Sequence, residues 1–307
     1  MAYSLPYFKF RKSLEREIRD YWSIAIAADF SNSWLNQFDS EKRITQVAEN
    51  IPPYSYVDIK CSDYVKQLST VIEHSRENAL VNFITAFEVY LFEILSRIVY
   101  LRPENLANSE MKFDAKEIVS GLENSKDFKL WFSDASTDKT VRNKQHTEII
   151  ARIAKMAKCD LKPMNSVIEE WNKWTYVRNA IVHSGRRVSS DLKNIWQSKF
   201  PTLGAKLNIP DNEIMKVQSI AMAIAKHLEN RINKTIIDFE DASLLVRELF
   251  ARNGIDDINQ LKRILQKNIS YRAKKQQIEK ALSFQRKAGS VITEMNFDGF
   301  INEVDIT

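Results

Sequence analysis

The residues whose types and spacing best suit chemistry lie in the hexapeptide RNAIVH, which runs from Arg178 to His183. Arginine is permanently charged and contacts phosphate through two parallel N–H donors. Histidine titrates near neutral pH and can act as a general acid or a general base. Together they could cleave an RNA phosphodiester without a metal, by deprotonating the 2′-OH, stabilising the pentavalent phosphorane and protonating the 5′-oxygen. The products would be a 2′,3′-cyclic phosphate, or a 3′-phosphate, and a 5′-hydroxyl.

The spacing of these residues indicates how such a site would be built. On a helix, Asn179 and His183 share one face because they are four residues apart. Arg178 lies about 140° around the helix axis from His183, at about 100° per residue. One helix therefore cannot easily direct both side chains at one atom, whereas two copies packed across a two-fold axis could. The sequence predicts a homodimer with a composite site, in which Asn179 orients His183 or binds phosphate.

A helix over 163–184 is predicted to position this motif. Pro163 favours a helix start and Gly185 favours a helix end. An apolar stripe runs along the segment through four residues: Val167, Trp171, Trp174 and Ile181. The two tryptophans are predicted to pack in a core or a dimer interface rather than to stack on bases. Arg178 occupies a gap in the stripe and needs a partner or a cleft there, because an unpaired buried charge is costly.

A second helix is predicted over 62–101, where apolar residues recur at spacings of three and four before Pro103. Glu88 lies on or beside the apolar face of this helix and is a candidate partner for Arg178. Two roles remain open for the pair. Glu88 would hold Arg178 for catalysis, or the two would form a buried ion pair that only stabilises the fold.

The hexapeptide resembles the R-N-x-x-x-H signature (Arg-x4–6-His) of the HEPN superfamily. Residues 83–95, FITAFEVYLFEIL, resemble the early helix of that family with its acidic position, here Glu88. The resemblance covers about 61–236. It implies an all-α, metal-independent endoribonuclease of the kind found in toxin–antitoxin, abortive-infection and CRISPR systems. Such a protein would act as a toxin or an anti-phage (antiviral) defence effector. Its partners would be RNA and an antitoxin or another defence protein. Some relatives extend the motif to His-x-Tyr for modification by an antitoxin; Gly185 replaces that tyrosine here, which argues against that form of neutralisation.

The composition also predicts an all-α fold. Only 6 Gly and 7 Pro occur in 307 residues, too few for the many tight turns of a sandwich, barrel or propeller. Cys61 and Cys159 alone cannot make a disulfide framework or a zinc site, and no Gly-rich phosphate loop occurs, so no metal and no cofactor are expected. The first residues hold no apolar signal core and no apolar run of 18 residues is found. We therefore expect a cytoplasmic protein with no membrane span.

Three regions are expected along the chain: an N-terminal helical extension over 1–60, a HEPN-like helical bundle over 61–236 and a small basic helical subdomain over 237–307. In the first region a helix over 7–30 is predicted to end at SNSW, residues 31–34. In the second, the polar sequence SDASTDK after residue 132 predicts a loop.

The distribution of charge indicates where RNA could bind. Residues 252–289 hold ten Lys and Arg against three Asp and Glu, a local charge of +7 (10 − 3) within a chain of net charge +5. A solvated helix face is the alternative reading of this segment. The candidate RNA-binding residues are Arg186, Arg187, Lys262, Arg263, Lys274 and Lys275.

Two other functions compete with RNA cleavage. One is a non-catalytic HEPN-like module that binds nucleotide, nucleic acid or protein; the other is a DNA-binding regulator built on 240–307, where two short helices meet at a glycine turn. The remaining histidines, His74, His146 and His227, are interpreted as incidental. Arg142, Asn143 and His146 repeat the motif one residue too close together, in a polar stretch that we interpret as surface.

Overall fold

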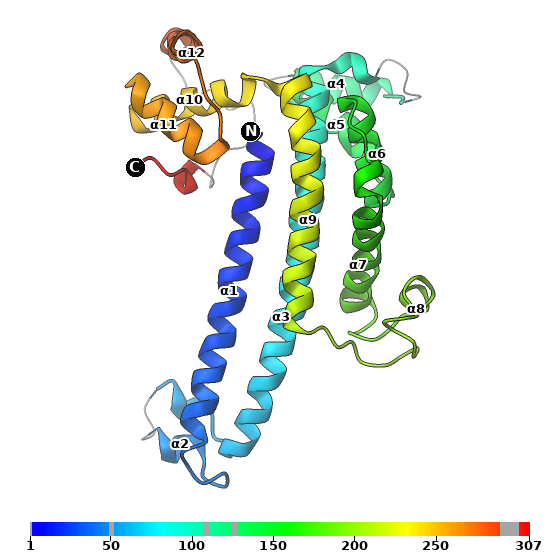
Figure 1. Cartoon of the computed structure of the whole chain (residues 1–307), viewed down its shortest axis with the longest axis vertical. Coiled ribbons are helices and arrows are strands. Elements are labelled where there is room, and N and C mark those ends of the chain that lie inside the picture. The colour runs from blue at the N-terminus through cyan, green and yellow to red at the C-terminus, as the bar shows by residue number, and fades with distance from the viewer. Residues whose placement is uncertain (1, 49–51, 107–110, 125–127, 289–300) are drawn as a thin grey trace. The chain divides into compact units, whose positions relative to one another are not determined.

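Helices account for the whole architecture of the residues that the computed structural model describes, which are 2–48, 52–106, 111–124, 128–288 and 301–307 (Figure 1). These residues form twelve α-helices and no strand, so the fold is all-α, as predicted. The helices are α1 (Leu5–Leu35), α2 (Ile44–Val47), α3 (Cys61–Leu101), α4 (Ala115–Asn124), α5 (Phe128–Val141), α6 (His146–Ala157), α7 (Asn165–His183), α8 (Ser190–Ile195), α9 (Asp211–Ile232), α10 (Glu240–Asn253), α11 (Ile258–Ile269) and α12 (Lys275–Ala288).

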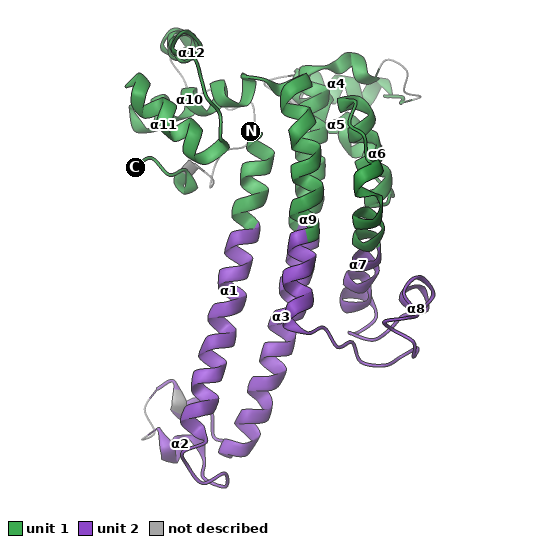
Figure 2. Ribbon diagram, in the orientation of Figure 1, with its two compact units in different colours: residues 1–13, 86–172, 220–307 green, residues 14–85, 173–219 purple. Residues whose placement is uncertain are grey.

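The chain divides into two compact units that alternate along the sequence (Figure 2). Unit 1 comprises 1–13, 86–172 and 220–307, and unit 2 comprises 14–85 and 173–219. The long helices α1, α3, α7 and α9 each supply a segment to both units. These units do not follow the three consecutive regions expected from the sequence, because segments far apart in the chain pack together within each unit.

Aromatic and aliphatic side chains of α3 form the core of the fold. The eight residues that carry its three- and four-residue spacing are all buried, which confirms the predicted helix: Leu80, Phe83, Ile84, Phe87, Leu91, Ile94, Leu95 and Ile98. In unit 1 the Phe87 ring lies 5.7 Å from the Phe10 ring and 4.7 Å from the Trp171 ring, centroid to centroid. These edge-on contacts join α3 to α1 and α7.

The C-terminal helices share one apolar cluster with the start of α1, all within unit 1. Leu5 and Phe8 of α1 are buried with Leu245 of α10, Leu261 of α11 and Leu282 of α12. Figure 1 shows α10, α11 and α12 gathered beside the N-terminal end of α1. The region after residue 237 therefore shares its apolar cluster with the start of α1, and its assignment as a separate subdomain stays a prediction.

Single residues explain two helix ends in this region. Gly254 ends α10 in the left-handed conformation, with φ of 67°. Asp257 caps α11, where its Oδ1 accepts the Gln260 N–H at 2.6 Å.

A buried carboxylate ties the start of the chain to α9. Glu229 is fully buried and accepts four hydrogen bonds in unit 1. The donors are the Ser4 N–H at 2.8 Å, the Ser4 hydroxyl at 2.8 Å, the Tyr90 hydroxyl at 3.0 Å and the Asn233 amide at 2.6 Å. Burial raises the pKa of Glu229 from its ordinary 4.5 to about 7, while the bonds from Ser4 and Tyr90 oppose this shift.

This raised pKa predicts a pH dependence of stability. Between pH 4.5 and about 7 the folded state holds a proton on Glu229 that the unfolded state has released, so the free energy of unfolding falls as pH rises. We expect a loss of about 3 kcal/mol from this group across that range. Urea unfolding at a series of pH values would measure it, with Glu229→Gln as the variant that cannot titrate. An identical pH slope in the two proteins would contradict the prediction.

Unit 2 is held by polar contacts between helices that are distant in sequence. Asp211, the first residue of α9, accepts a hydrogen bond from the Tyr21 hydroxyl of α1 and one from Arg76 Nε of α3 at 2.5 Å. A small apolar cluster in the same unit is formed by the buried residues Leu35, Ile44 and Cys61.

Two predicted breaks in helices are wrong, and the polar residues explain why. The helix predicted to stop at 31–34 continues to Leu35, and the Ser31 hydroxyl bonds the Ala27 carbonyl at 2.8 Å. The predicted loop SDASTDK lies inside α5, where the Ser133 hydroxyl bonds the Leu130 carbonyl at 2.8 Å. Thr140 bonds the Ser136 carbonyl in the same way. Hydroxyls that bond a carbonyl three or four residues earlier can be buried in a helix without an unsatisfied polar atom.

One helix among the described residues, α3, is long and apolar enough in composition to span a membrane. Its most apolar 18-residue stretch is 56% buried inside the protein. Burial of that kind is typical of the core helix of a globular protein.

Candidate functional site

The apolar stripe of α7 differs from the one that the sequence predicts. Trp171 and Trp174 are fully buried, as predicted, but the next buried position is Val177 rather than Arg178. After Trp174 the next buried residue is thus three positions later, at Val177, and the buried face then continues with Ala180 and Ile181. Arg178 lies beside the stripe and is half-buried, so no guanidinium replaces a core side chain. The prediction that it occupies a gap in the stripe is wrong, because Val177 fills that position.

The motif itself occupies the last two turns of α7. Asn179 and His183 are exposed, and Val182 between them is 47% exposed. Arg178 Nη1 donates to Asn179 Oδ1 at 3.2 Å. Arg178 Nε is buried and bonds no atom of the described residues. The guanidinium thus has an N–H donor that no described residue uses, and the His183 imidazole, on a different side of the helix, is exposed.

The segment after α7 is held firmly in unit 2. Gly185 adopts φ of 57°, the left-handed conformation predicted for the helix end. Arg186 Nε donates to Glu77 Oε2 of α3 at 2.6 Å, and the Glu77 side chain is 5% exposed. Arg187 Nη1 donates to the Gly204 carbonyl at 3.0 Å. Both arginines therefore fix the end of α7, and their predicted contact with RNA stays a prediction.

Glu88 takes part in a network that the sequence did not indicate. Its Oε1 lies 3.0 Å from Nε2 of His146, and the Trp171 indole N–H donates to Nδ1 of the same ring at 3.0 Å, all within unit 1. An indole N–H only donates, so Nδ1 accepts and the ring proton lies on Nε2, facing the carboxylate. Glu88 belongs to unit 1 and Arg178 to unit 2, so their pairing stays a prediction.

This network corrects the interpretation of His146 as incidental and on the surface. The residue is 8% exposed and has a partner at each ring nitrogen. It opens α6 and connects that helix to α3 and α7. The sequence signal was present in the placement of a histidine at a helix start on the apolar face, but nothing in the sequence paired it with a tryptophan 25 residues later.

The basic stretch over 252–289 is partly neutralised in the structure. Four of its cations pair with carboxylates: Arg252 with Glu248, Lys267 with Asp305, Lys275 with Glu279 and Arg286 with Asp256. Of the residues predicted to bind RNA, Arg263 and Lys274 are exposed and Lys262 is half-buried, and none of these three has an ion pair among the described residues. Lys275 pairs only loosely, at 3.7 Å.

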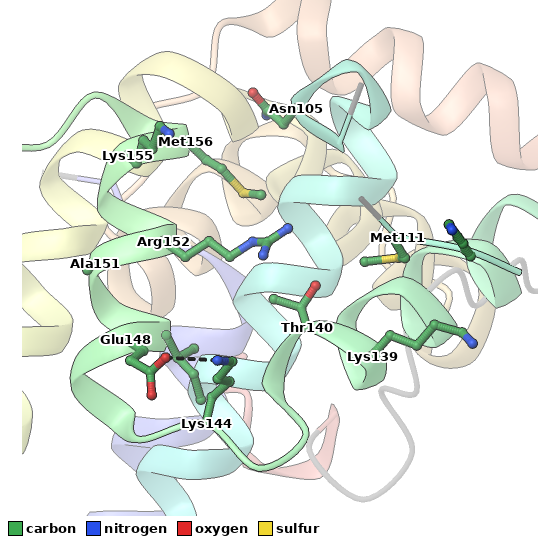
Figure 3. Close-up of a pocket in the computed structure, with 12 residues that line it drawn as sticks. Asn105, Met111, Lys139, Thr140, Lys144, Glu148, Ala151, Arg152, Lys155 and Met156 are labelled. Carbon is green, nitrogen blue, oxygen red and sulfur yellow. Dashed lines mark ion pairs between the residues drawn. The ribbon is translucent and has the colours of Figure 1, made fainter. Parts of the chain in front are cut away.

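The residues missed by sequence reasoning line a pocket in unit 1. Its cationic side chains come from α5, α6 and the segment before α4, and Arg152 and Lys155 lie on one side of α6 (Figure 3). The sequence feature that could have indicated this pocket is the polar face of the short amphipathic helix α6. Within the described parts of the chain, no group of three or more His, Cys, Asp or Glu could hold a metal ion.

Comparison with family models, curated proteins and solved structures finds no match to this chain. The chemistry must therefore be argued from the side chains themselves. The last turns of α7 combine a fixed cation, a titratable imidazole and an amide on an exposed helix end. Such a set can bind a phosphodiester and exchange protons with it.

Proposed function

We propose that this protein is a metal-independent endoribonuclease of HEPN type, acting in the cytoplasm as a toxin or anti-phage defence effector. The proposal is carried by one observation: RNAIVH occupies the solvent-facing end of α7 with His183 exposed and Arg178 holding donors that no described residue uses. Its cleavage products are a 2′,3′-cyclic phosphate or 3′-phosphate and a 5′-hydroxyl.

In this proposal each side chain has a separate task. The imidazole of His183 from one copy takes the 2′-OH proton and then gives a proton to the 5′-oxygen, so each site uses one His183. Arg178 stabilises the charge on the phosphorane, which needs a fixed cation and no metal. Asn179, bonded to Arg178 at 3.2 Å, holds the guanidinium or binds phosphate.

A homodimer follows from the same geometry. Arg178 and His183 point about 140° apart around one helix, so a complete site needs a second copy. Val182 lies on the exposed face between Asn179 and His183 and would be buried by that copy. The exposed cations Arg263 and Lys274 are proposed to contact RNA as well.

The test is RNA cleavage by the purified full chain in excess EDTA, with single-stranded RNA as substrate and product ends mapped by phosphatase and kinase treatment. We expect cleavage that persists in the chelator and leaves 5′-hydroxyl ends. Products with 5′-phosphate ends, or activity that disappears with EDTA, would exclude the proposed chemistry.

A further inference from the structure

A large basic pocket lies in unit 1, apart from the residues of the proposed nuclease site. Its volume is about 980 Å³, and its lining comes from the turn after α3, the segment before α4, α5, the turn between α5 and α6, and α6. Figure 3 shows Arg152 and Met156 of α6 reaching into it and Met111 on the opposite side. Its volume lies at the upper end of the range of roughly 300–1,000 Å³ that small-molecule sites occupy.

Cations dominate this lining. The charged residues are one carboxylate, Glu148, and five cations, giving a formal charge of +4 (5 − 1): Lys112, Lys139, Lys144, Arg152 and Lys155. Glu148 pairs with Lys144 at 3.1 Å, and Lys139 pairs with Glu117 at 2.7 Å. The other three cations have no hydrogen bond or ion pair with any residue in the described part of the chain. Net positive charge is therefore left to face the pocket.

Arg152 is the central cation. It is half-buried and extends from α6 into the pocket, with Met156 beside it (Figure 3). A guanidinium offers five N–H donors in a planar fork that fits phosphate oxygens in pairs. A half-buried arginine with no protein partner is the arrangement expected of an anion site awaiting its ligand.

Apolar and neutral groups line the rest of the pocket. Met111 and Met156 present thioether chains, which adapt to flat rings, and Ile149 is buried at the base. The side-chain amide of Asn105 is half-buried and bonds no described residue, so it can donate to and accept from a base. The lining thus offers thioether groups close to the cations that would bind phosphate.

Three carboxylates lie close in sequence to the pocket's cations or bond one of them. Asp114 follows Lys112 by two residues, Asp138 directly precedes Lys139, and Glu117 bonds Lys139. A long RNA strand needs a continuous basic track, which these acids interrupt. We propose that the pocket binds a nucleotide with two or three phosphates, its phosphates on Arg152 and Lys155 and its base against the two methionines.

The experiment is calorimetric titration of the full chain with ATP, GTP, inorganic triphosphate and a short single-stranded RNA. We expect saturable binding of ATP or GTP, with Arg152→Gln weakening it tenfold or more, as loss of a charge-assisted bond to phosphate predicts. The matched control is Arg142→Gln, which removes the same charge in the same unit from an exposed arginine outside the pocket. Arg142→Gln should leave the affinity unchanged, and both variants should keep the wild-type melting temperature.

Four results would overturn the inference. They are the absence of saturable nucleotide binding below about 1 mM, an equal loss of affinity in both variants, triphosphate binding as tightly as the nucleotides, and tighter Arg152-dependent binding of the RNA. Cleavage of RNA is measured separately, so failure here leaves the proposed nuclease function untouched, and the reverse also holds.

Discussion

Replacing His183 with alanine is expected to slow RNA cleavage by about 10²–10⁴-fold, because the variant lacks the group that exchanges protons with the 2′-OH and the 5′-oxygen. His183 is exposed at the end of α7, so the protein should fold and melt as the wild type does. Initial rates on a fluorescent single-stranded RNA, together with thermal unfolding, would measure both quantities.

Replacing Arg178 is expected to slow RNA cleavage as much as replacing His183, and two substitutions at Arg178 can separate the role of its charge from that of its shape. Arg178→Lys keeps the charge but loses the planar fork, so it should retain part of the activity that Arg178→Ala loses. Arg142→Ala is the matched control, because Arg142 precedes an asparagine and a histidine in the near-copy of the motif and is exposed. It should cleave at the wild-type rate.

Mixing the two inactive variants tests the dimer. If each site takes Arg178 from one copy and His183 from the other, a mixed dimer of Arg178→Ala and His183→Ala has one intact site. Random mixing should then restore about a quarter of the wild-type rate. No recovery would count against a site shared in this way. Full activity in both single variants would exclude the proposed nuclease, and unfolding of Arg178→Ala alone would favour a purely structural arginine.

The largest expected effect on stability comes from the ion pair between Arg97 and Asp241 in unit 1. Arg97 Nε lies 2.6 Å from Asp241 Oδ1, and each side chain is 2% exposed. Asp241 also accepts the Leu5 N–H at 2.8 Å, which anchors the start of α1. Arg97→Met would leave a buried carboxylate without its cation, so we expect a loss of about 3–5 kcal/mol in the free energy of unfolding.

A double-mutant cycle would separate the pair from its surroundings. Arg97→Met with Asp241→Leu removes both charges, so the double variant should lose less than the sum of the two single variants. Arg142→Met breaks the exposed pair with Asp138, whose side chains are 69% and 50% exposed, and should change stability little. Additive losses at Arg97 and Asp241 would show that the pair is not coupled.

Much of the helical framework could be predicted from local pattern. The apolar spacing of α3 and the helix end at Gly185 are properties of adjacent residues, and the structure confirms them. The errors at 31–34 and in α5 arise because Ser and Thr favour turns in isolation, whereas in α5 Ser133 meets the Ser96 hydroxyl at 3.2 Å. Contacts between distant segments decide such cases, and a local pattern does not contain them.

The candidate site was predictable only in part. The sequence places Arg178, Asn179 and His183 on one helix end, because that follows from spacing alone. It misplaced Arg178 in the apolar stripe, since a single three-residue step at Val177 moves the buried face. It also missed the Trp171–His146–Glu88 network and the pocket around Arg152, because their members come from separate helices that only the tertiary fold joins.

The shared cluster at the start of α1 has a consequence for folding. Leu5 packs in the same apolar cluster as Val304, so two segments that are far apart in the sequence must meet before that cluster can close. Domains ordinarily fold from the N-terminus onward as they leave the ribosome, and contacts between remote segments form late. Closure of this cluster is therefore expected to be a late step in the folding of the chain.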